Sequence, residues 1–287
     1  MSAVLPAAAP IGFVARALRH PSFAVGGALT LLLLLAATVS LVWSPYPPAE
    51  IDIPNKLLGS SAAHWFGTDS LGRDTASQLL VGSQATIVVG VFAVLIGFSI
   101  GTALGLLASA RRGWVEEGVM RLSDFTFAFP ALLSAILLGA IYGPGLVTGI
   151  VAIGIFNVPV FARVTRAAGN AIWAREYVLA ARAAGKNRWQ ITWHHVVPNI
   201  ASVLIVQATN QFATAIIAEA ALSYLGLGTQ PPMPSWGRML NEAQTQMFQA
   251  PMLAVYPGMT IVLAVLGLNL MGDGLRDLLD PKLARKR

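Results

Sequence analysis

The sequence predicts an all-α membrane protein with six transmembrane helices and both termini in the cytoplasm. Hydrophobic residues make up 55% of the 287 residues and charged residues only 11%, whereas soluble domains carry about 25% charged residues. Six apolar runs reach or approach the roughly 20 residues that a helix needs to cross a bilayer, and they leave no room for a separate soluble domain. The chain has no cysteine, which excludes disulfides, thiolate metal sites and cysteine nucleophiles.

Charge orients these runs in the membrane. The predicted spans are residues 25–43, 85–110, 125–142, 146–161, 200–222 and 252–272. Of the 19 lysines and arginines, 16 fall on the side that holds both termini, and only Lys56, Arg73 and Arg238 fall on the other. The positive-inside rule therefore assigns the termini to the cytoplasm. The same distribution explains the net charge of +6 without nucleic-acid binding.

The spans divide the chain into five parts. These are a cytoplasmic tail at 1–24, the first span at 25–43, an extracytoplasmic segment at 44–84, a five-helix core at 85–274 and a cytoplasmic tail at 275–287. Arg16 and Arg19 before a leucine-rich run also resemble a signal peptide. Because the first span is longer than the roughly 7–15 residues of a signal-peptide core, we expect an uncleaved signal anchor.

Small residues line one face of the second span. Glycines recur there at spacings of seven and four residues, at Gly90, Gly97, Gly101 and Gly105. Such a stripe lets two helices approach closely within lipid, so we expect this face to pack against another span. Pro130 and Pro159, inside or near the ends of the third and fourth spans, are expected to kink those helices or free backbone carbonyls.

Polar side chains share one face of the fifth span. They are Gln207, Asn210, Gln211 and Thr214, at helical offsets of three, four and seven residues. Polar groups at this depth usually face a bundle interior or a wet cavity. They either form hydrogen bonds between helices or line a translocation path, and we favour the path. Asn157 on the fourth span is a further candidate for the same cavity.

The segment between the fourth and fifth spans, residues 175–198, is basic and is predicted to form a helix, a bend and a second helix. Gly185 suits the end of the first helix because glycine adopts positive φ. Asn187 and Gln190 have the spacing of a capping box that restarts the chain as a helix, and Pro198 fits the first turn of the next helix. We expect one face of the first helix to be formed by Tyr177, Ala180, Ala181 and Ala184, and the apolar stripe of the second by Trp189, Trp193, Val196 and Val197.

This segment resembles a cytoplasmic loop of ABC importer permeases, which runs Glu-Ala-Ala, three residues, Gly, nine residues, Ile, one residue, Leu-Pro. The matching residues are Ala180, Ala181, Gly185 and Pro198, whereas Leu179, His195 and Val197 replace the Glu, Ile and Leu. Glu176, one turn earlier, is a candidate to replace the lost carboxylate. Taken alone, the segment also fits an ordinary amphipathic loop.

Further runs resemble the second of the two permease subunits in transporters of peptides and nickel. They are HWFGTDSLGRD at 64–74, GWVEEGVMRLSDFTFAFP at 113–130, AEAALSYLGLGTQPPMPSWG at 218–237 and NLMGDGLRDLLDP at 269–281. His64 and Asp74 also suggest a metal site or a catalytic pair, but without a third ligand or an oriented nucleophile we predict a structural turn. The resemblance implies the type I permease fold of an ABC importer in the bacterial inner membrane.

The resemblance also implies partners. A second, different permease subunit would form a heterodimer with this chain, surrounded by membrane lipid, with two ATPase subunits or domains and an extracytoplasmic substrate-binding protein. In the family the loop at 163–198 docks a short coupling helix onto the ATPase. The residues assigned to this coupling are Glu176, Ala180, Ala181, Arg182, Gly185, Lys186, Asn187, Arg188, Trp189 and Pro198.

No catalytic, cofactor or metal site is expected in the chain itself. Its only Gly-Lys pair, Gly185-Lys186, is followed by asparagine, whereas a P-loop needs Ser or Thr there and an earlier glycine. ATP and Mg²⁺ would therefore be bound by the partner ATPases. A secondary transporter would carry ionisable residues near the midplane, and a membrane enzyme would need convergent catalytic groups, so both alternatives are disfavoured. We rank di- or oligopeptides first as substrate, then nickel or a metallophore, then glutathione or an opine-like compound.

Overall fold

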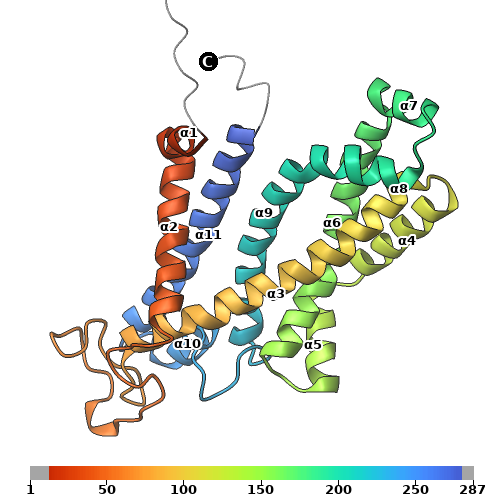
Figure 1. Ribbon diagram of the computed structural model, residues 1–287. Coiled ribbons are helices and arrows are strands. Elements are labelled where there is room, and N and C mark those ends of the chain that lie inside the picture. The colour runs from red at the N-terminus through yellow and green to blue at the C-terminus, as the bar shows by residue number, and fades with distance from the viewer. Residues whose placement is uncertain (1–12, 280–287) are drawn as a thin grey trace, which may run out of the picture.

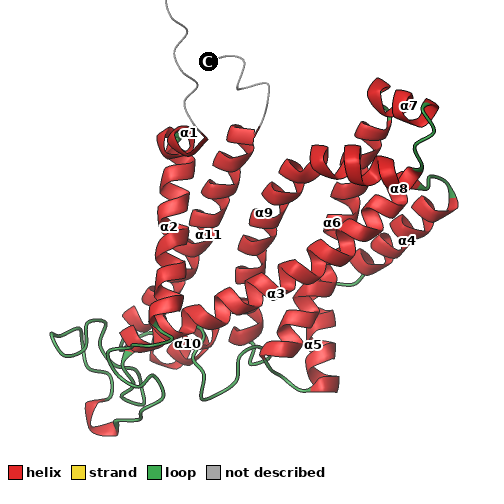
Figure 2. Ribbon diagram, in the orientation of Figure 1, coloured by secondary structure: helices red, strands yellow, loops and turns green. Residues whose placement is uncertain are grey.

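A computed structural model describes residues 13–279 of the chain. Within this range the regular elements are helical (Figure 2), and Thr68 and Asp74 form an isolated β-bridge. The helices are α1 (Phe13–Arg19), α2 (Pro21–Val39), α3 (Thr75–Ala110), α4 (Trp114–Ala128), α5 (Ala131–Tyr142), α6 (Leu146–Trp173), α7 (Glu176–Ala183), α8 (Arg188–Ile191), α9 (Val197–Tyr224), α10 (Trp236–Ala243) and α11 (Met252–Leu279), with short turns η1 (Ile53–Asn55), η2 (Thr192–Val196) and η3 (Gln244–Gln246).

Five stretches of helix are long and apolar enough to cross a membrane. They are α2, α3, α6, the stretch Arg188–Tyr224 that contains α8 and α9, and α11; the pair α4 and α5 is a sixth candidate. The predicted all-α fold is confirmed, with these six candidates at the places of the six predicted spans. Residues 1–12 and 280–287 of the two predicted tails lie outside the described residues.

The two ends of the molecule carry different helices and segments (Figure 1). One end carries α1, α7, α8 and the end of α11, and is called the α7 end below. The other end carries α10 and the irregular segment 44–74, and is called the α10 end. The helices α2 and α11 run side by side between the two ends, while α3 crosses obliquely toward α6.

The third predicted span is not one straight helix. The helices α4 and α5 meet at an angle of 81°. Phe129 is extended, with φ −92° and ψ 130°, because the ring of a following proline disfavours the helical conformation of the residue before it. Pro130 therefore bends the span predicted at 125–142, and the kink expected at this proline is confirmed.

Two helices begin earlier than the apolar runs indicated. Helix α2 begins at Pro21, since proline is well suited to the first helical position. Helix α3 begins at Thr75 because the carboxylate of Asp74 accepts a hydrogen bond from the backbone N–H of Ser77 at 2.7 Å. The irregular part of the predicted segment 44–84 is therefore shorter, at 44–74, and its remainder extends the second span.

As predicted, the glycine stripe of α3 packs against another span, which is α6 at Gly97, Gly101 and Gly105. A Cβ atom added to Gly97 would overlap Asn157, and one added to Gly101 would overlap the carbonyl oxygen of Val158. At Gly105 the added atom would lie 2.5 Å from Cβ of Thr165. Such close backbone approach maximises dispersion contacts within lipid. The tightly packed pair of α3 and α6 supports the loop that follows α6.

Candidate functional site

The basic segment at the α7 end forms the predicted helix, bend and helix. Helix α7 ends in a left-handed residue, Gly185, with φ +82°. The N–H of Lys186 donates to the carbonyl of Ala181, and the N–H of Gly185 donates to that of Arg182, both at 3.1 Å. This pair of bonds satisfies the last carbonyls of the helix. A Cβ atom at Gly185 would meet nothing within 4 Å, so conformation and not space requires glycine here.

The chain restarts as a helix through the predicted capping box. The side chain of Asn187 accepts from the N–H of Gln190 at 2.8 Å, and the side chain of Gln190 accepts from the N–H of Asn187 at 3.0 Å. These bonds satisfy N–H groups that a helix start leaves without partners. Pro198 lies in the first turn of α9, as predicted.

The buried face of the restarted helix differs from the predicted stripe. Ile191 and Val196 are fully buried, whereas Trp189 and Trp193 remain exposed. The reason is the π-helical turn η2, Thr192–Val196, whose wider repeat brings residues five apart onto one face. A stripe drawn at ordinary α-helical spacing therefore included Val196 correctly, missed Ile191 and wrongly added the two tryptophans.

The predicted face of α7 is also corrected. Val178 is the buried residue of this helix, at 0% exposure. Tyr177, Ala180 and Ala184 are exposed, and Ala181 is half-buried. With a single large aliphatic residue facing the core, α7 is held mainly through Val178 and leaves most of its surface open to a partner.

Positive side chains of the loop are exposed and without ion pairs among the described residues: Arg182, Lys186 and Arg188. The Nζ atom of Lys186 lies 3.3 Å from Nε2 of His195. Glu176 is exposed in the first turn of α7, where a negative charge favours the helix dipole. By contrast, Arg166 on α6 donates to Glu116 at 2.6 Å. The loop is therefore a basic surface available to an acidic partner.

The polar stripe of α9 is present, with its residues at different depths. Gln207, Asn210 and Gln211 are half-buried and Thr214 is exposed. The hydroxyl of Thr214 donates to the carbonyl of Asn210 at 3.0 Å, and a Cβ atom at Gly272 of α11 would lie 3.1 Å from the side-chain oxygen of Asn210. Asn210 thus contacts α11, while the neighbouring amides are open to a further molecule.

Asn157 lies apart from this stripe. It is buried between α6 and α3, at 5% exposure, and its amide donates to the carbonyl of Ala93 at 3.4 Å. The adjacent Gly97 leaves space for it. In this chain Asn157 therefore contributes to helix packing, which is the alternative that the sequence left open for such amides.

A charged network joins the segment 44–74 to α10 at the α10 end. The guanidinium of Arg73 donates to Asp69 at 2.6 Å and also contacts Glu242. Burial alone lowers the pKa of Arg73, but the two carboxylates outweigh it and raise the pKa above its usual value. Glu242 was missed because it lies 169 residues from Arg73; only its helical pairing with Arg238 is visible in the sequence.

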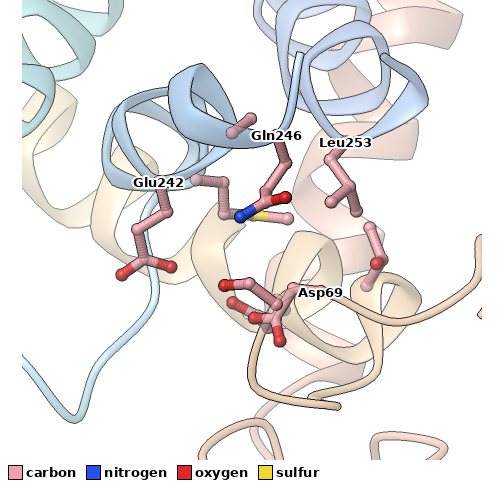
Figure 3. Close-up of a pocket in the computed structure, with 9 residues that line it drawn as sticks. Asp69, Glu242, Gln246 and Leu253 are labelled. Carbon is pink, nitrogen blue, oxygen red and sulfur yellow. The ribbon is translucent and has the colours of Figure 1, made fainter. Parts of the chain in front are cut away.

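A small pocket lies over this network (Figure 3). Asp69, Glu242, Gln246 and Leu253 contribute to its lining and come from the segment 44–74, α10, η3 and α11. In the same segment, His64 Nδ1 lies 2.9 Å from Asp74 Oδ1. Since Asp74 is the N-cap of α3 and the turns at Gly67 and Gly72 have positive φ, the run 64–74 forms the predicted structural turn.

Comparison with known proteins decides the family. Residues 101–285, more than half of the chain, match the family described as "Binding-protein-dependent transport system inner membrane component". The chain belongs to this family. The predicted resemblance to ABC importer permeases of the peptide group is therefore confirmed. Membership makes the chain a multi-pass permease of the inner membrane and implies ATPase and binding-protein partners.

The permease has curated relatives along nearly its whole length. It is 44% identical to the glutathione transport system permease protein GsiD of Pectobacterium atrosepticum over 274 residues, covering 94% of this chain and 90% of that protein. It is 43% identical to the dipeptide transport system permease protein DppC of Alkalihalophilus pseudofirmus over 255 residues, covering 89% and 84%. A GsiD of Escherichia coli O157:H7 is 44% identical over 270 residues, covering 93% and 89%. These matches name no residues, so the coupling and path assignments stay predictions.

Proposed function

We propose that this permease imports short peptides, glutathione included, as one half of a heterodimeric membrane channel driven by partner ATPases. The relatives named for glutathione and for dipeptides are almost equally similar to it, at 44% and 43% identity. Glutathione is itself a tripeptide, so both names support one chemical class. Nickel or a metallophore is the second candidate, which no feature of the described residues favours.

The observation that carries this proposal is that α9 presents half-buried amide side chains and that an exposed basic loop directly precedes this helix. The half-buried amides of Gln207 and Gln211 offer donors and acceptors that match the peptide groups of a substrate. The exposed basic loop directly precedes the N-terminus of α9, about three helical turns before these amides. When the ATPases displace the loop, α9 transmits this displacement to the amides.

The orientation follows from charge. The α7 end carries the basic loop and most of the arginines, so we place it in the cytoplasm by the positive-inside rule. In this orientation the ATPases, which bind ATP and Mg²⁺, meet α7 and α8, and the binding protein meets the α10 end. The permease itself is non-catalytic. ATP-driven closure of the ATPases would move α8 and open the cavity alternately to the two sides.

Competitive uptake tests the substrate. Cells with and without the permease gene receive labelled glutathione, a labelled dipeptide and labelled nickel in parallel. Loss of glutathione or dipeptide uptake, restored by the gene on a plasmid, is the expected result. Loss of nickel uptake alone would replace the substrate class, and unchanged uptake of all three would overturn the proposal.

A further inference from the structure

A groove lies between the last turns of α3 and the restarted helix at the α7 end. It is lined by α3 on one side and by α8 and η2 on the other. Its wall along α3 is largely apolar and includes Phe98, Ala103, Leu106, Leu107 and Ala110. A continuous apolar wall of this kind is a binding site for a hydrophobic molecule.

Two arginines lie at the mouth of this groove. Arg111 follows the last residue of α3, and Arg188 is the first residue of α8. Both are exposed, and neither forms an ion pair within residues 13–279. Arg163 and Arg166, at the same end, are each paired with a carboxylate of α4. Two like charges from separate elements thus meet at one groove and lack a counter-anion.

Aromatic side chains complete the mouth of the groove. Trp189 and Trp193 both line it, and their rings meet edge to face with centroids 5.7 Å apart. Indole rings concentrate at the boundary between hydrocarbon and headgroups, where an apolar body and a polar N–H are both satisfied. The mouth therefore has the chemistry of the membrane interface, and the apolar wall that of the membrane interior.

The apolar wall along α3 is about as long as one leaflet of the bilayer is thick. The stretch of α3 from Phe98 to Ala110 spans about 18 Å at 1.5 Å per residue. One leaflet contributes roughly half of the ~30 Å hydrocarbon core. An acyl chain extended along this wall would thus be covered over most of its length.

We propose that the groove binds an anionic phospholipid of the cytoplasmic leaflet, with its phosphate between Arg111 and Arg188 and an acyl chain along α3. Basic pockets between helices on the cytoplasmic side suit such headgroups. The inference rests on the orientation in the proposed function. The bound lipid holds α8 against α3 and so links membrane composition to the loop that meets the ATPase. A second apolar groove, lined by α2, α3 and α11, has no charged residue in its lining and selects no headgroup.

Lipid retention by the whole transporter tests this inference. The complex with its partner subunits is assembled in nanodiscs of equal phosphatidylglycerol and phosphatidylethanolamine, released into detergent and weighed by native mass spectrometry. Wild type should retain phosphatidylglycerol. The double variant Arg111→Gln/Arg188→Gln should retain it roughly thirtyfold more weakly, because each arginine near an anionic headgroup contributes about 1 kcal/mol, or about fivefold.

Matched variants distinguish lipid binding in the groove from a general effect of positive charge at this end of the protein. Arg112→Gln removes the neighbouring charge outside the groove lining and should change nothing. Ala103→Phe fills the apolar wall with both arginines intact and should also release the lipid. Equal retention in wild type and the double variant, unchanged retention in Ala103→Phe, or loss of a partner subunit in place of lipid would overturn the inference. Lipid retention is measured without any transport substrate. A failure of peptide uptake would therefore overturn the proposed function and leave the lipid-binding inference standing.

Discussion

Reversing the charges of Arg182 and Lys186 together is expected to abolish stimulated ATP hydrolysis and uptake while the permease remains in the membrane. Both side chains are exposed on the loop and have no ion-pair partner among the described residues. On the proposed function they face acidic groups of the ATPase. Like charges juxtaposed in an interface cost several kcal/mol, so docking should weaken by more than about a hundredfold. Substrate-stimulated ATP hydrolysis by the reconstituted complex measures the loss.

A second double reversal controls for total charge. Arg112 lies just after the end of α3 and Arg276 in the last turn of α11; both are exposed and lie outside the loop. Arg112→Glu/Arg276→Glu changes the net charge by the same amount as Arg182→Glu/Lys186→Glu. It should keep most of the stimulation. Unchanged stimulation in the loop variant, or equal loss in both variants, would show that the loop charges do not dock the ATPase.

Replacing Gly101 by leucine is expected to prevent assembly of the permease. A Cβ atom there would overlap the backbone carbonyl of Val158 and come 2.7 Å from Cβ of Phe161, so α3 and α6 would have to separate. Overpacking of a well-packed core costs typically 1–3 kcal/mol and occasionally more. The cost should be at the upper end, because a backbone atom cannot rotate away. The yield of monodisperse complex should fall at least about tenfold.

The control for this variant is Gly27→Leu. Gly27 also lies in a spanning helix, α2, but a Cβ atom there meets nothing within 4 Å. The two substitutions add the same side chain to the same kind of residue. Normal yield from Gly27→Leu with loss in Gly101→Leu is expected, whereas equal yields would show that the α3–α6 contact is not needed for assembly.

Local chemistry made much of the fold predictable from the sequence. The apolar runs located the spans because backbone groups in lipid must be satisfied within helices. The glycine stripe identified the packed face of α3, and Gly185 with Asn187 identified the bend, because each depends on residues within a few positions. These features need no knowledge of distant contacts.

Other features depended on contacts that no local pattern reveals. The π-helical turn η2 places Ile191 on the buried face together with Val196 and leaves Trp189 and Trp193 exposed, and no pattern at ordinary helical spacing predicts this turn. The contact of Arg73 with Glu242 joins segments far apart in the chain. Asn157 could be assigned to helix packing only once its neighbours on α3 were known, since an isolated amide fits a packed interface and a wet cavity equally well.

Site-directed cross-linking tests the central claim most directly. The chain has no cysteine, so one introduced thiol gives an unambiguous cross-link. Ala184→Cys lies exposed in the loop between the two coupling charges, and Ala62→Cys lies exposed in the segment 44–74 at the α10 end. In the assembled transporter, a thiol-to-amine reagent should join Cys at 184 to an ATPase subunit and Cys at 62 to the binding protein alone. An ATPase cross-link from position 62, or none from position 184, would contradict the proposed orientation and the coupling role of this loop.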